Sequence, residues 1–349
     1  MQTNANAWLK RCMFMVSVPL LLIAVFNYWL DPLWLFDHSN RWNNRQSPFD
    51  LRLQKVNYIA GHPFDYEALL LGSSRVAWIN QFDFRPMTTY NFAVYAMNPE
   101  DYNDYIEFAK RKNGKPFQTI LIGLDFDATN AFMYEHQQKV PLSSYIRLTE
   151  HFPYKMEALL SYATVKYSLG VLWNTITSGA SDPIPYFSRD NVFHVEKPQQ
   201  PAAWNRVLDI SKQQSGGSYR YKDLTPVFQE IKKNNPDSRF IVFTTPVSQE
   251  MFRVLVTDGN YADYERWISD IVDSFGEVHH FMYESEVTRD RDNFYDAGHA
   301  LPRIDQRMAE EMMNEAALPS TRKGSEFDRI IRRDNLEQQL MELRSIHYK

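Results

Sequence analysis

Two short stretches, far apart in the sequence, hold residue types that together could form a nucleophile and its base. The stretch 69–75 reads Leu-Leu-Leu-Gly-Ser-Ser-Arg, so an apolar run ends on a glycine and two serines. The stretch 294–299 reads Phe-Tyr-Asp-Ala-Gly-His, and its carboxylate and imidazole are three residues apart. A serine hydroxyl is a poor nucleophile at neutral pH and needs such a base. The two stretches together are therefore compatible with nucleophilic catalysis by a serine.

The chemistry of these side chains suggests their roles. Asp296 could hold one ring nitrogen of His299 and fix its tautomer, which leaves the other nitrogen free to take a proton from a serine. Taken alone, Asp-x-x-His is a weak signal, because such a pair usually means a surface turn. Ser73 could be the nucleophile or merely a turn residue that precedes Ser74.

Composition and motif content exclude several other classes of function. The chain has 349 residues, of which 44% are hydrophobic and 23% charged, as in a globular protein. A formal net charge of -5 argues against nucleic acid as the main partner, because binding phosphate backbones needs clustered Lys and Arg. The single cysteine, Cys12, allows no internal disulfide and no cysteine zinc cluster. There is no P-loop, dinucleotide fingerprint or HExxH helix, so we expect no cofactor and no metal.

The N-terminal residues predict a membrane anchor. Residues 1–11 end in Lys10-Arg11, and the next residues, 12–30, include no charge. Such a run is long enough to cross a bilayer, and it does not end in the small residues of a signal-peptide cleavage site. The basic pair predicts a cytoplasmic N-terminus, so that most of the chain lies outside the cytoplasm. The alternative interpretation is a buried core helix.

After a polar connector at 31–63, apolar runs alternate with helical patterns. Strands are predicted in four apolar runs, at 66–72, 117–125, 239–247 and 278–283. The apolar period of 261–276 predicts an amphipathic helix that ends at Gly276, and Asn98-Pro99 and Thr225-Pro226 are typical of helix starts. Strands separated by helices predict an α/β fold with a parallel sheet. The first and last elements of such a domain can meet at the carboxyl edge of its sheet.

Two regions interrupt this alternation of strands and helices. At about 130–215 no strand pattern is clear, and we expect a mostly helical insertion over one side of the sheet. The charged tail 320–349 predicts a surface helix, with docking on a partner as an alternative, so the α/β domain would span 64–319.

His279 and His280 point to opposite sides of a strand, so we expect one buried and one exposed ring rather than a shared metal.

The two chemistry-bearing stretches resemble the SGNH hydrolase superfamily. Gly72-Ser73-Ser74 stands where that family has Gly-Asp-Ser, and Asp296-Ala297-Gly298-His299 is similar to its terminal Asp-x-x-His. The resemblance implies a doubly wound (flavodoxin-like) parallel sheet. It also implies that Ser74 is the nucleophile, His299 the base and Asp296 the acid that orients the base.

The middle blocks depart from the family's pattern. The second block normally offers a glycine N–H to the oxyanion, but this chain has Ala93 and Ala96, which still carry backbone N–H groups. The third block normally has an asparagine where this chain has Asp125. An ionised Asp125 would oppose an oxyanion, so it must point away, stay protonated or serve structure. Arg75, next to Ser74, could steer an anionic substrate, or it could be solvated or paired.

With its anchor and Gly-Ser-Ser-Arg, the chain resembles a membrane-anchored branch of the superfamily that includes the teichoic acid D-alanylation protein and proteins encoded with exopolysaccharide machinery. This implies transfer of an acetyl or other acyl group to or from a cell-surface or exopolysaccharide, through an acyl-enzyme on Ser74. It places a periplasmic domain on a single-pass anchor in the bacterial cytoplasmic membrane. The implied partners are a glycan acceptor and a membrane-bound O-acyltransferase or polysaccharide synthesis complex. The chain would be an O-acyltransferase or an acyl esterase, and the alternative is a catalytically inactive scaffold subunit.

Overall fold

The computed structural model divides the chain into two compact units. The first combines Met1–Pro63 with Pro141–Asp190, and the second combines Phe64–Val140 with Asn191–Lys349. The residues described are 2–46, 49–132, 140–177, 185–195, 201–215, 219–257, 259–317 and 325–348.

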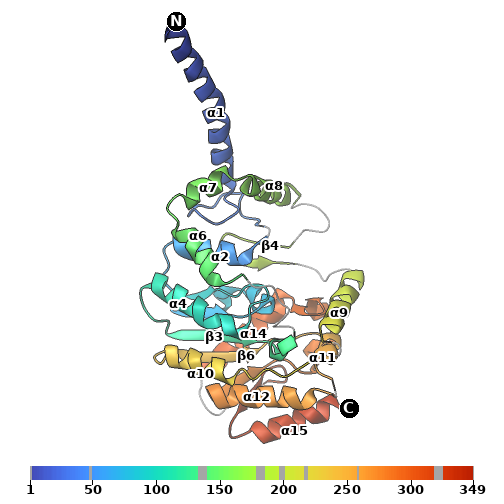
Figure 1. Cartoon of the computed structure of the whole chain (residues 1–349). Coiled ribbons are helices and arrows are strands. Elements are labelled where there is room, and N and C mark those ends of the chain that lie inside the picture. The colour runs from blue at the N-terminus through green and yellow to red at the C-terminus, as the bar shows by residue number, and fades with distance from the viewer. Residues whose placement is uncertain are drawn as a thin grey trace. The chain divides into compact units, whose positions relative to one another are not determined.

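The first unit is a cluster of helices assembled from two separate segments of the chain. Its elements are α1 (Gln2–Leu30), α2 (Leu51–Gly61), α6 (Leu142–Glu150), α7 (Tyr154–Leu160), α8 (Tyr162–Ile176) and the short strand β4 (Tyr186–Phe187). Leu33, Leu35 and Ala158 form a small buried cluster in this unit, and Figure 1 shows how its helices are arranged. Arg189 Nη2 lies 2.7 Å from Asp31 Oδ2, and this buried ion pair joins the two segments.

This unit differs from the connector and the insertion expected from the sequence. Residues 31–63 include α2, which Asp50 caps and which buries Leu51, Val56 and Ile59. Of the predicted insertion at 130–215, Pro141–Asp190 packs with the N-terminal segment, whereas the residues from Asn191 onward belong to the second unit. Contacts between its two segments join residues far apart in sequence, such as Asn57 with Tyr154, 97 positions apart, and Asp31 with Arg189, 158 positions apart. Local periodicity carries no signal of such contacts.

Helix α1 covers the predicted membrane anchor. The most apolar 18-residue window within Ala5–Leu30 has a mean hydropathy of 2.0, and only 11% of that window is buried in the described structure. By length and composition, α1 can therefore cross a membrane.

The second unit is an α/β domain around a mostly parallel sheet, as the sequence predicts. The strands are β1 (Ala68–Leu71), β2 (Thr89–Asn91), β3 (Thr119–Leu124), β6 (Arg239–Thr244), β7 (Glu277–His280) and β10 (Arg329–Arg332). Their order is β2-β1-β3-β6-β7-β10, and every neighbouring pair is parallel except β7 with β10. The four predicted strands correspond to β1, β3, β6 and β7. Strands β1 and β3 are buried along their whole length, which explains their continuous apolar sequences.

Helices and short turns connect these strands. The helices are α3 (Ser74–Ala77), α4 (Tyr102–Asn113), α9 (Pro201–Ser215), α10 (Thr225–Asn234), α11 (Gln249–Leu255), α12 (Tyr261–Phe275), α13 (Glu286–Arg289), α14 (Pro302–Ala317) and α15 (Leu336–His347). The 3-10 turns are η1 (Gln81–Phe84), η2 (Pro99–Asp101), η3 (Phe126–Thr129) and η5 (Arg291–Asn293), and β5 covers Phe193–His194. The predicted helix at 261–276 is α12, and Gly276 follows it with a φ of 95°, which favours glycine.

The C-terminal tail contributes a strand that the sequence analysis did not predict. Strand β10 pairs antiparallel with β7 and covers that edge of the parallel sheet. As a result, the expectation of one exposed histidine on β7 is wrong, because both rings are buried. His279 Nδ1 lies 2.7 Å from Asp328 Oδ2, just before β10, and His280 Nε2 lies 2.7 Å from the Tyr264 hydroxyl.

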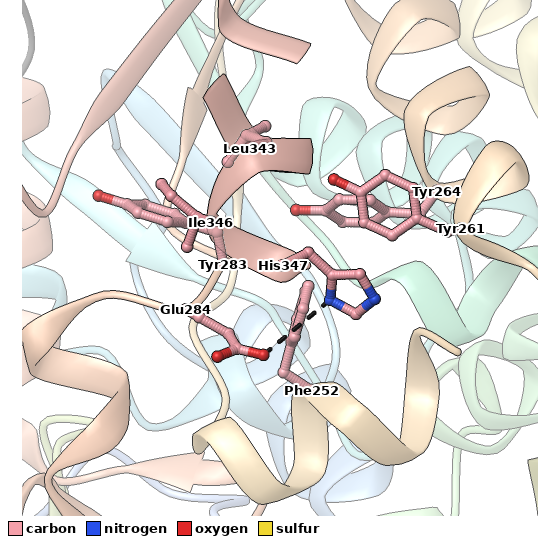
Figure 2. A pocket seen from close by; sticks show the side chains of 8 residues that line it. All are labelled: Phe252, Tyr261, Tyr264, Tyr283, Glu284, Leu343, Ile346 and His347. Atoms are coloured by element: carbon pink, nitrogen blue, oxygen red, sulfur yellow. Dashed lines mark ion pairs between the residues drawn. The ribbon is translucent and has the colours of Figure 1, made fainter. Parts of the chain in front are cut away.

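The helix of the tail also packs against the domain. The ring of His347, at the end of α15, stacks on Tyr261 with 4.5 Å between centroids. Figure 2 shows this ring facing Glu284, whose Oε1 lies 4.0 Å from His347 Nδ1. Arg253 Nε holds the same carboxylate at 2.9 Å. The tail is therefore anchored to α11 and α12 and is not a free surface helix.

Two glycines allow α3 to pack closely on the ends of β1 and β3. A Cβ atom on either Gly72 or Gly123 would overlap the side chain of Val76 in α3, and one on Gly123 would also crowd Phe243. The position of α3 therefore depends on the missing side chains of these two residues.

We expect Gly123→Ala to destabilise the α/β unit by about 1–3 kcal/mol, the usual cost of overpacking a core. The double variant Gly123→Ala/Val76→Ala should recover part of this loss, because it removes the methyl groups that clash. Gly170→Ala is the control, since a Cβ there meets no atom within 4 Å. Urea unfolding of the full chain in detergent measures the effect, and equal stability of the single and double variants would contradict it.

A buried carboxyl group on α14 predicts a pH-dependent stability. Burial, and then the charge of Asp83, raise the pKa of Asp305 well above 3.8, and Asp305 Oδ2 has no hydrogen-bond partner in the described structure. The folded chain keeps this proton to a higher pH than the unfolded chain does. The stability of the wild type should therefore fall as the pH rises above about 4.

Asp305→Asn should remove this effect, so the variant should exceed the wild type in melting temperature more at pH 8 than at pH 5. The exposed Asp334→Asn is the matched control, with the same small difference at both pH values. If Asp305→Asn gave equal shifts at pH 5 and pH 8, Asp305 would not be the group that titrates.

Candidate active site

Ser74 lies at the point where β1 gives way to α3. It is the first residue of α3, and the Ser73 hydroxyl caps the helix by accepting a hydrogen bond from Arg75 N at 3.2 Å. The hydroxyl of Ser73 also bonds the carboxylate of Asp125. Ser73 is thus occupied by structural contacts, whereas the Ser74 hydroxyl points to an imidazole. This is the carboxyl end of a central strand, where open α/β sheets bind their ligands.

His299 and Asp296 face each other across a tight hairpin. Strands β8 (Phe294–Asp296) and β9 (His299–Ala300) pair antiparallel, and Asp296 lies directly opposite His299. Residues directly opposite on paired strands have neighbouring side chains, so the spacing of three works here through a two-residue loop. Ser248 N donates to the Ala297 carbonyl at 3.0 Å and fixes the hairpin to the segment after β6.

The structure brings Ser74, His299 and Asp296 into one hydrogen-bonded chain. Ser74 Oγ lies 2.8 Å from His299 Nε2, across 225 residues of sequence. His299 Nδ1 lies 2.8 Å from Asp296 Oδ1. Burial would raise the pKa of Asp296, but the hydrogen bond and charge of His299 and the N–H groups of Gly298 and His299 lower it below its usual value. An ionised Asp296 can hold the His299 tautomer that accepts a proton at Nε2.

Trp78 supports the imidazole from one side. Its ring stacks on His299 with 4.5 Å between centroids, and Phe193 stacks on Trp78 at 4.3 Å. The edge of the stack is closed by Tyr295, whose ring centroid is 5.3 Å from that of Trp78. The stack therefore restricts the orientation of the His299 ring.

Sequence reasoning missed Trp78. Its one sequence signal is its position, four residues after Ser74, because residues at this spacing share a face at a helical turn. Tryptophan is also a common core residue, so this spacing alone does not distinguish a residue that supports the site from one that only packs in the core.

Arg75 is the centre of a buried ionic network. Its Nη1 lies 2.8 Å from Asp127 Oδ1 and 3.1 Å from Asp125 Oδ1. Its Nε donates to the Gly298 carbonyl at 3.1 Å. Burial would lower the pKa of Arg75, but the two carboxylates raise it above its ordinary value. Of the two interpretations of Arg75, the structure supports the paired one, so its charge is not free to steer a substrate.

The same network explains the aspartate at position 125. Burial would raise the pKa of Asp125, but Arg75 and the hydroxyls of Ser73 and Thr245 lower it below its usual value. Asp125 is therefore ionised, points to Arg75 and serves structure. Because the guanidinium compensates its charge, Asp125 opposes a nearby oxyanion less than an isolated carboxylate would.

The predicted oxyanion donors differ in their surroundings. Ala93 is fully buried, and its N–H donates to Asn91 Oδ1 at 3.0 Å, so it is turned away from a substrate. Ala96 is exposed and has a φ of 53°, a conformation that favours glycine. The N–H of Ser74 lies at the start of α3, and no described residue accepts a hydrogen bond from it. The Ser74 N–H is therefore the donor best placed beside the reacting hydroxyl.

Metal binding has no support in the described part of the chain. No group of three or more His, Cys, Asp or Glu side chains among these residues could hold a metal ion. The pocket of Figure 2 is lined by side chains of α11, α12, the segment after β7 and the tail, and it includes none of the predicted site residues.

Comparison with known proteins gives no family assignment. No protein-family model matches the chain, and no curated protein matches it in sequence. The function has to be argued from the geometry of the site.

We expect Arg75→Met to destabilise the α/β unit by about 3–5 kcal/mol, because it leaves two buried carboxylates without their cation. Asp125→Asn should cost only about 1–2 kcal/mol, since Arg75 keeps its bond to Asp127. Arg333→Met, which removes an exposed arginine 3.8 Å from Asp273, is the control and should change stability by less than about 0.5 kcal/mol. Urea unfolding compares the three variants, and an Arg75→Met effect as small as that of Arg333→Met would refute the network.

Proposed function

We propose that this chain is a serine-dependent acyl-transfer enzyme that forms an acyl-enzyme on Ser74. The observation that carries the proposal is the 2.8 Å contact between Ser74 Oγ and His299 Nε2, with Asp296 on the other ring nitrogen. In unrelated serine hydrolases, the nucleophilic hydroxyl is activated by the same chain of hydrogen bonds, which runs from a serine to a histidine and from the histidine to an ionised carboxylate. The network around Arg75 fixes the segments that carry these groups.

In the first step, Ser74 Oγ attacks the carbonyl carbon of an ester or thioester while His299 Nε2 takes the hydroxyl proton. The carbonyl electrons move onto oxygen, where the Ser74 N–H stabilises the charge. When the intermediate collapses, the carbonyl re-forms, the bond to the leaving group breaks, and His299 returns the proton to that group. In the second step, a hydroxyl gives its proton to His299 and attacks the acyl carbon. The bond from that carbon to Ser74 Oγ then breaks, and His299 returns the proton to Ser74 Oγ.

The acceptor in the second step decides the name of the activity. If a glycan hydroxyl attacks, the chain is an O-acyltransferase, and if water attacks, it is an acyl esterase. The resemblance to the membrane-anchored branch of the SGNH superfamily supports a cell-surface or exopolysaccharide substrate and a membrane-bound O-acyltransferase as partner. The strand order β2-β1-β3-β6-β7 supports a doubly wound, flavodoxin-like sheet, because it is the order 2-1-3-4-5 of that architecture.

The proposed location is the periplasmic side of a bacterial cytoplasmic membrane. Helix α1 would be the single-pass anchor, and Lys10 and Arg11 before its apolar run favour a cytoplasmic N-terminus.

The test is acyl-enzyme formation by the full chain in detergent with p-nitrophenyl acetate. We expect a burst of p-nitrophenol and one acetyl group on Ser74, found by mass spectrometry of peptides. Ser74→Ala should abolish the burst, and His299→Ala should slow it by on the order of 10³-fold or more. Ser269→Ala, a serine on α12 outside the site, should behave as the wild type. Adding an oligosaccharide then separates transfer from hydrolysis by the product formed.

Absence of any release of p-nitrophenol that depends on Ser74, together with no acetyl group on Ser74 in the folded wild type, would refute the enzyme proposal and leave the scaffold subunit as the alternative. The departure at Asp125, which removes the family's side-chain amide donor, is the observation that favours that alternative.

A further inference from the structure

Helix α8 has large apolar side chains on its exposed face and polar side chains on its buried face, the reverse of a helix in a water-soluble unit. Its buried residues include Thr164, Ser168 and Asn174, which are polar. Its outward side chains include large apolar ones at helical spacing, namely Tyr162, Leu169, Trp173 and Ile176, each more than half exposed. A surface helix in water normally shows the opposite distribution. Contiguous exposed apolar side chains usually mark a contact with a protein or a membrane.

The neighbouring segment extends the same surface. Phe152, Met156 and Leu160 are exposed in and just before α7, at intervals of four residues. This spacing places them on one side of the chain at that point. We call these three residues and the four outward residues of α8 the apolar platform.

The apolar platform is attached to the last turns of α1. Asn27 Nδ2 donates to the Leu159 carbonyl of α7 at 2.8 Å, and the Ser168 hydroxyl of α8 donates to Asn27 Oδ1 at 2.8 Å. Figure 1 shows α7 and α8 lying across the C-terminal end of α1. Asn27 is three residues from the end of α1, which is about 4.5 Å along a helix axis. Helices α7 and α8 therefore contact α1 within about one turn of its C-terminal end.

Side-chain types on these helices match a membrane interface. Tyr28 and Trp29 are exposed on the last turn of α1, and Tyr162 and Trp173 are exposed on α8. Tyrosine and tryptophan concentrate where hydrocarbon meets headgroups, because their rings are apolar and their polar atoms can reach water. Lys166 lies on the same exposed face of α8, and a lysine there can extend its ammonium group to lipid phosphates.

We propose that α7 and α8 lie in the membrane interface beside α1, with the apolar platform inserted among the lipid headgroups and upper acyl chains. The anchor of this chain is then one spanning helix with two helices that lie flat against the bilayer. The proposal rests on α1 spanning the membrane and not on the chemistry at Ser74. It commits to lipid because the platform continues the exposed apolar surface of α1 at a hydrogen-bonded junction.

The test uses nitroxide labels on single cysteines in the full chain, in a Cys12→Ala background, reconstituted into phospholipid vesicles. Labels at Leu169→Cys and Trp173→Cys report on the platform, and Leu21→Cys reports on the span. Met341→Cys on α15 is the matched control, because Met341 is 62% exposed and Trp173 is 63% exposed. Collisions with oxygen, which enters lipid, are compared with collisions with a charged nickel chelate, which stays in water.

We expect the two platform labels to give an oxygen-to-chelate collision ratio below that of Leu21→Cys, which lies deeper in the bilayer, and several-fold above that of Met341→Cys. Chelate access equal to that of Met341→Cys, with Leu21→Cys still in lipid, would overturn the proposal. Labels closed to both reagents would also overturn it, since a protein surface such as a second copy would then cover the platform. If Leu21→Cys is itself in water, the span fails and the platform proposal fails with it, whereas acetylation of Ser74 would be unaffected.

Discussion

The buried guanidinium of Arg75 joins the three segments on which the site depends. It follows Ser74 in sequence, binds the two aspartates that follow β3, and holds the carbonyl before His299. Removing charges from water costs free energy that only close opposite charges and hydrogen bonds offset. The hydroxyls of Ser73 and Thr245 supply further hydrogen bonds to Asp125. Because these groups satisfy one another's charges and hydrogen bonds, the network stabilises the arrangement of the three segments in which Ser74 faces His299.

Packing supports the same arrangement from below. Helix α3, which begins at Ser74, packs on Gly72 and Gly123, because a side chain on either glycine would overlap Val76. The stack of Phe193 on Trp78 and of Trp78 on His299 closes the other side of the imidazole. His299 therefore has a carboxylate at one nitrogen, a hydroxyl at the other and an aromatic ring on its face. The geometry of the site thus depends on contacts between residues that are close in space and far apart in sequence, such as those of His299 with Ser74 and Trp78.

The parts of the fold that could be predicted are those with a strong local signal. Strands β1 and β3 are continuous apolar runs because both of their faces are buried, and α12 shows its apolar face in its period. Strand β10 has only two apolar residues, which lie between arginines, so the sequence does not predict this short edge strand. Without β10 in the predicted sheet, one of the two rings of His279 and His280 was expected to be exposed. The sequence does not predict that Met1–Pro63 and Pro141–Asp190 form one unit, because these two segments are far apart in the chain.

The parts of the candidate site that could be predicted are likewise those with a local signal in the sequence. Asp296 and His299 could be paired from their spacing, and the apolar run before Ser74 indicated a strand end. The partners of Arg75 could not be predicted, because Asp125 and Asp127 lie about fifty positions away and no sequence pattern relates them. The role of Ala93 was also hidden, since the side chain of Asn91 takes its N–H and only the structure shows it.

The central claim is that the Ser74 hydroxyl is activated in the folded chain, and labelling with a serine-reactive fluorophosphonate tests it most directly. The account predicts one phosphonyl group per chain, mapped to Ser74 by mass spectrometry, and a greatly slowed reaction when His299 is replaced by alanine. Labelling of another serine, no labelling of the folded membrane-reconstituted chain, or an equal rate without His299 would contradict it.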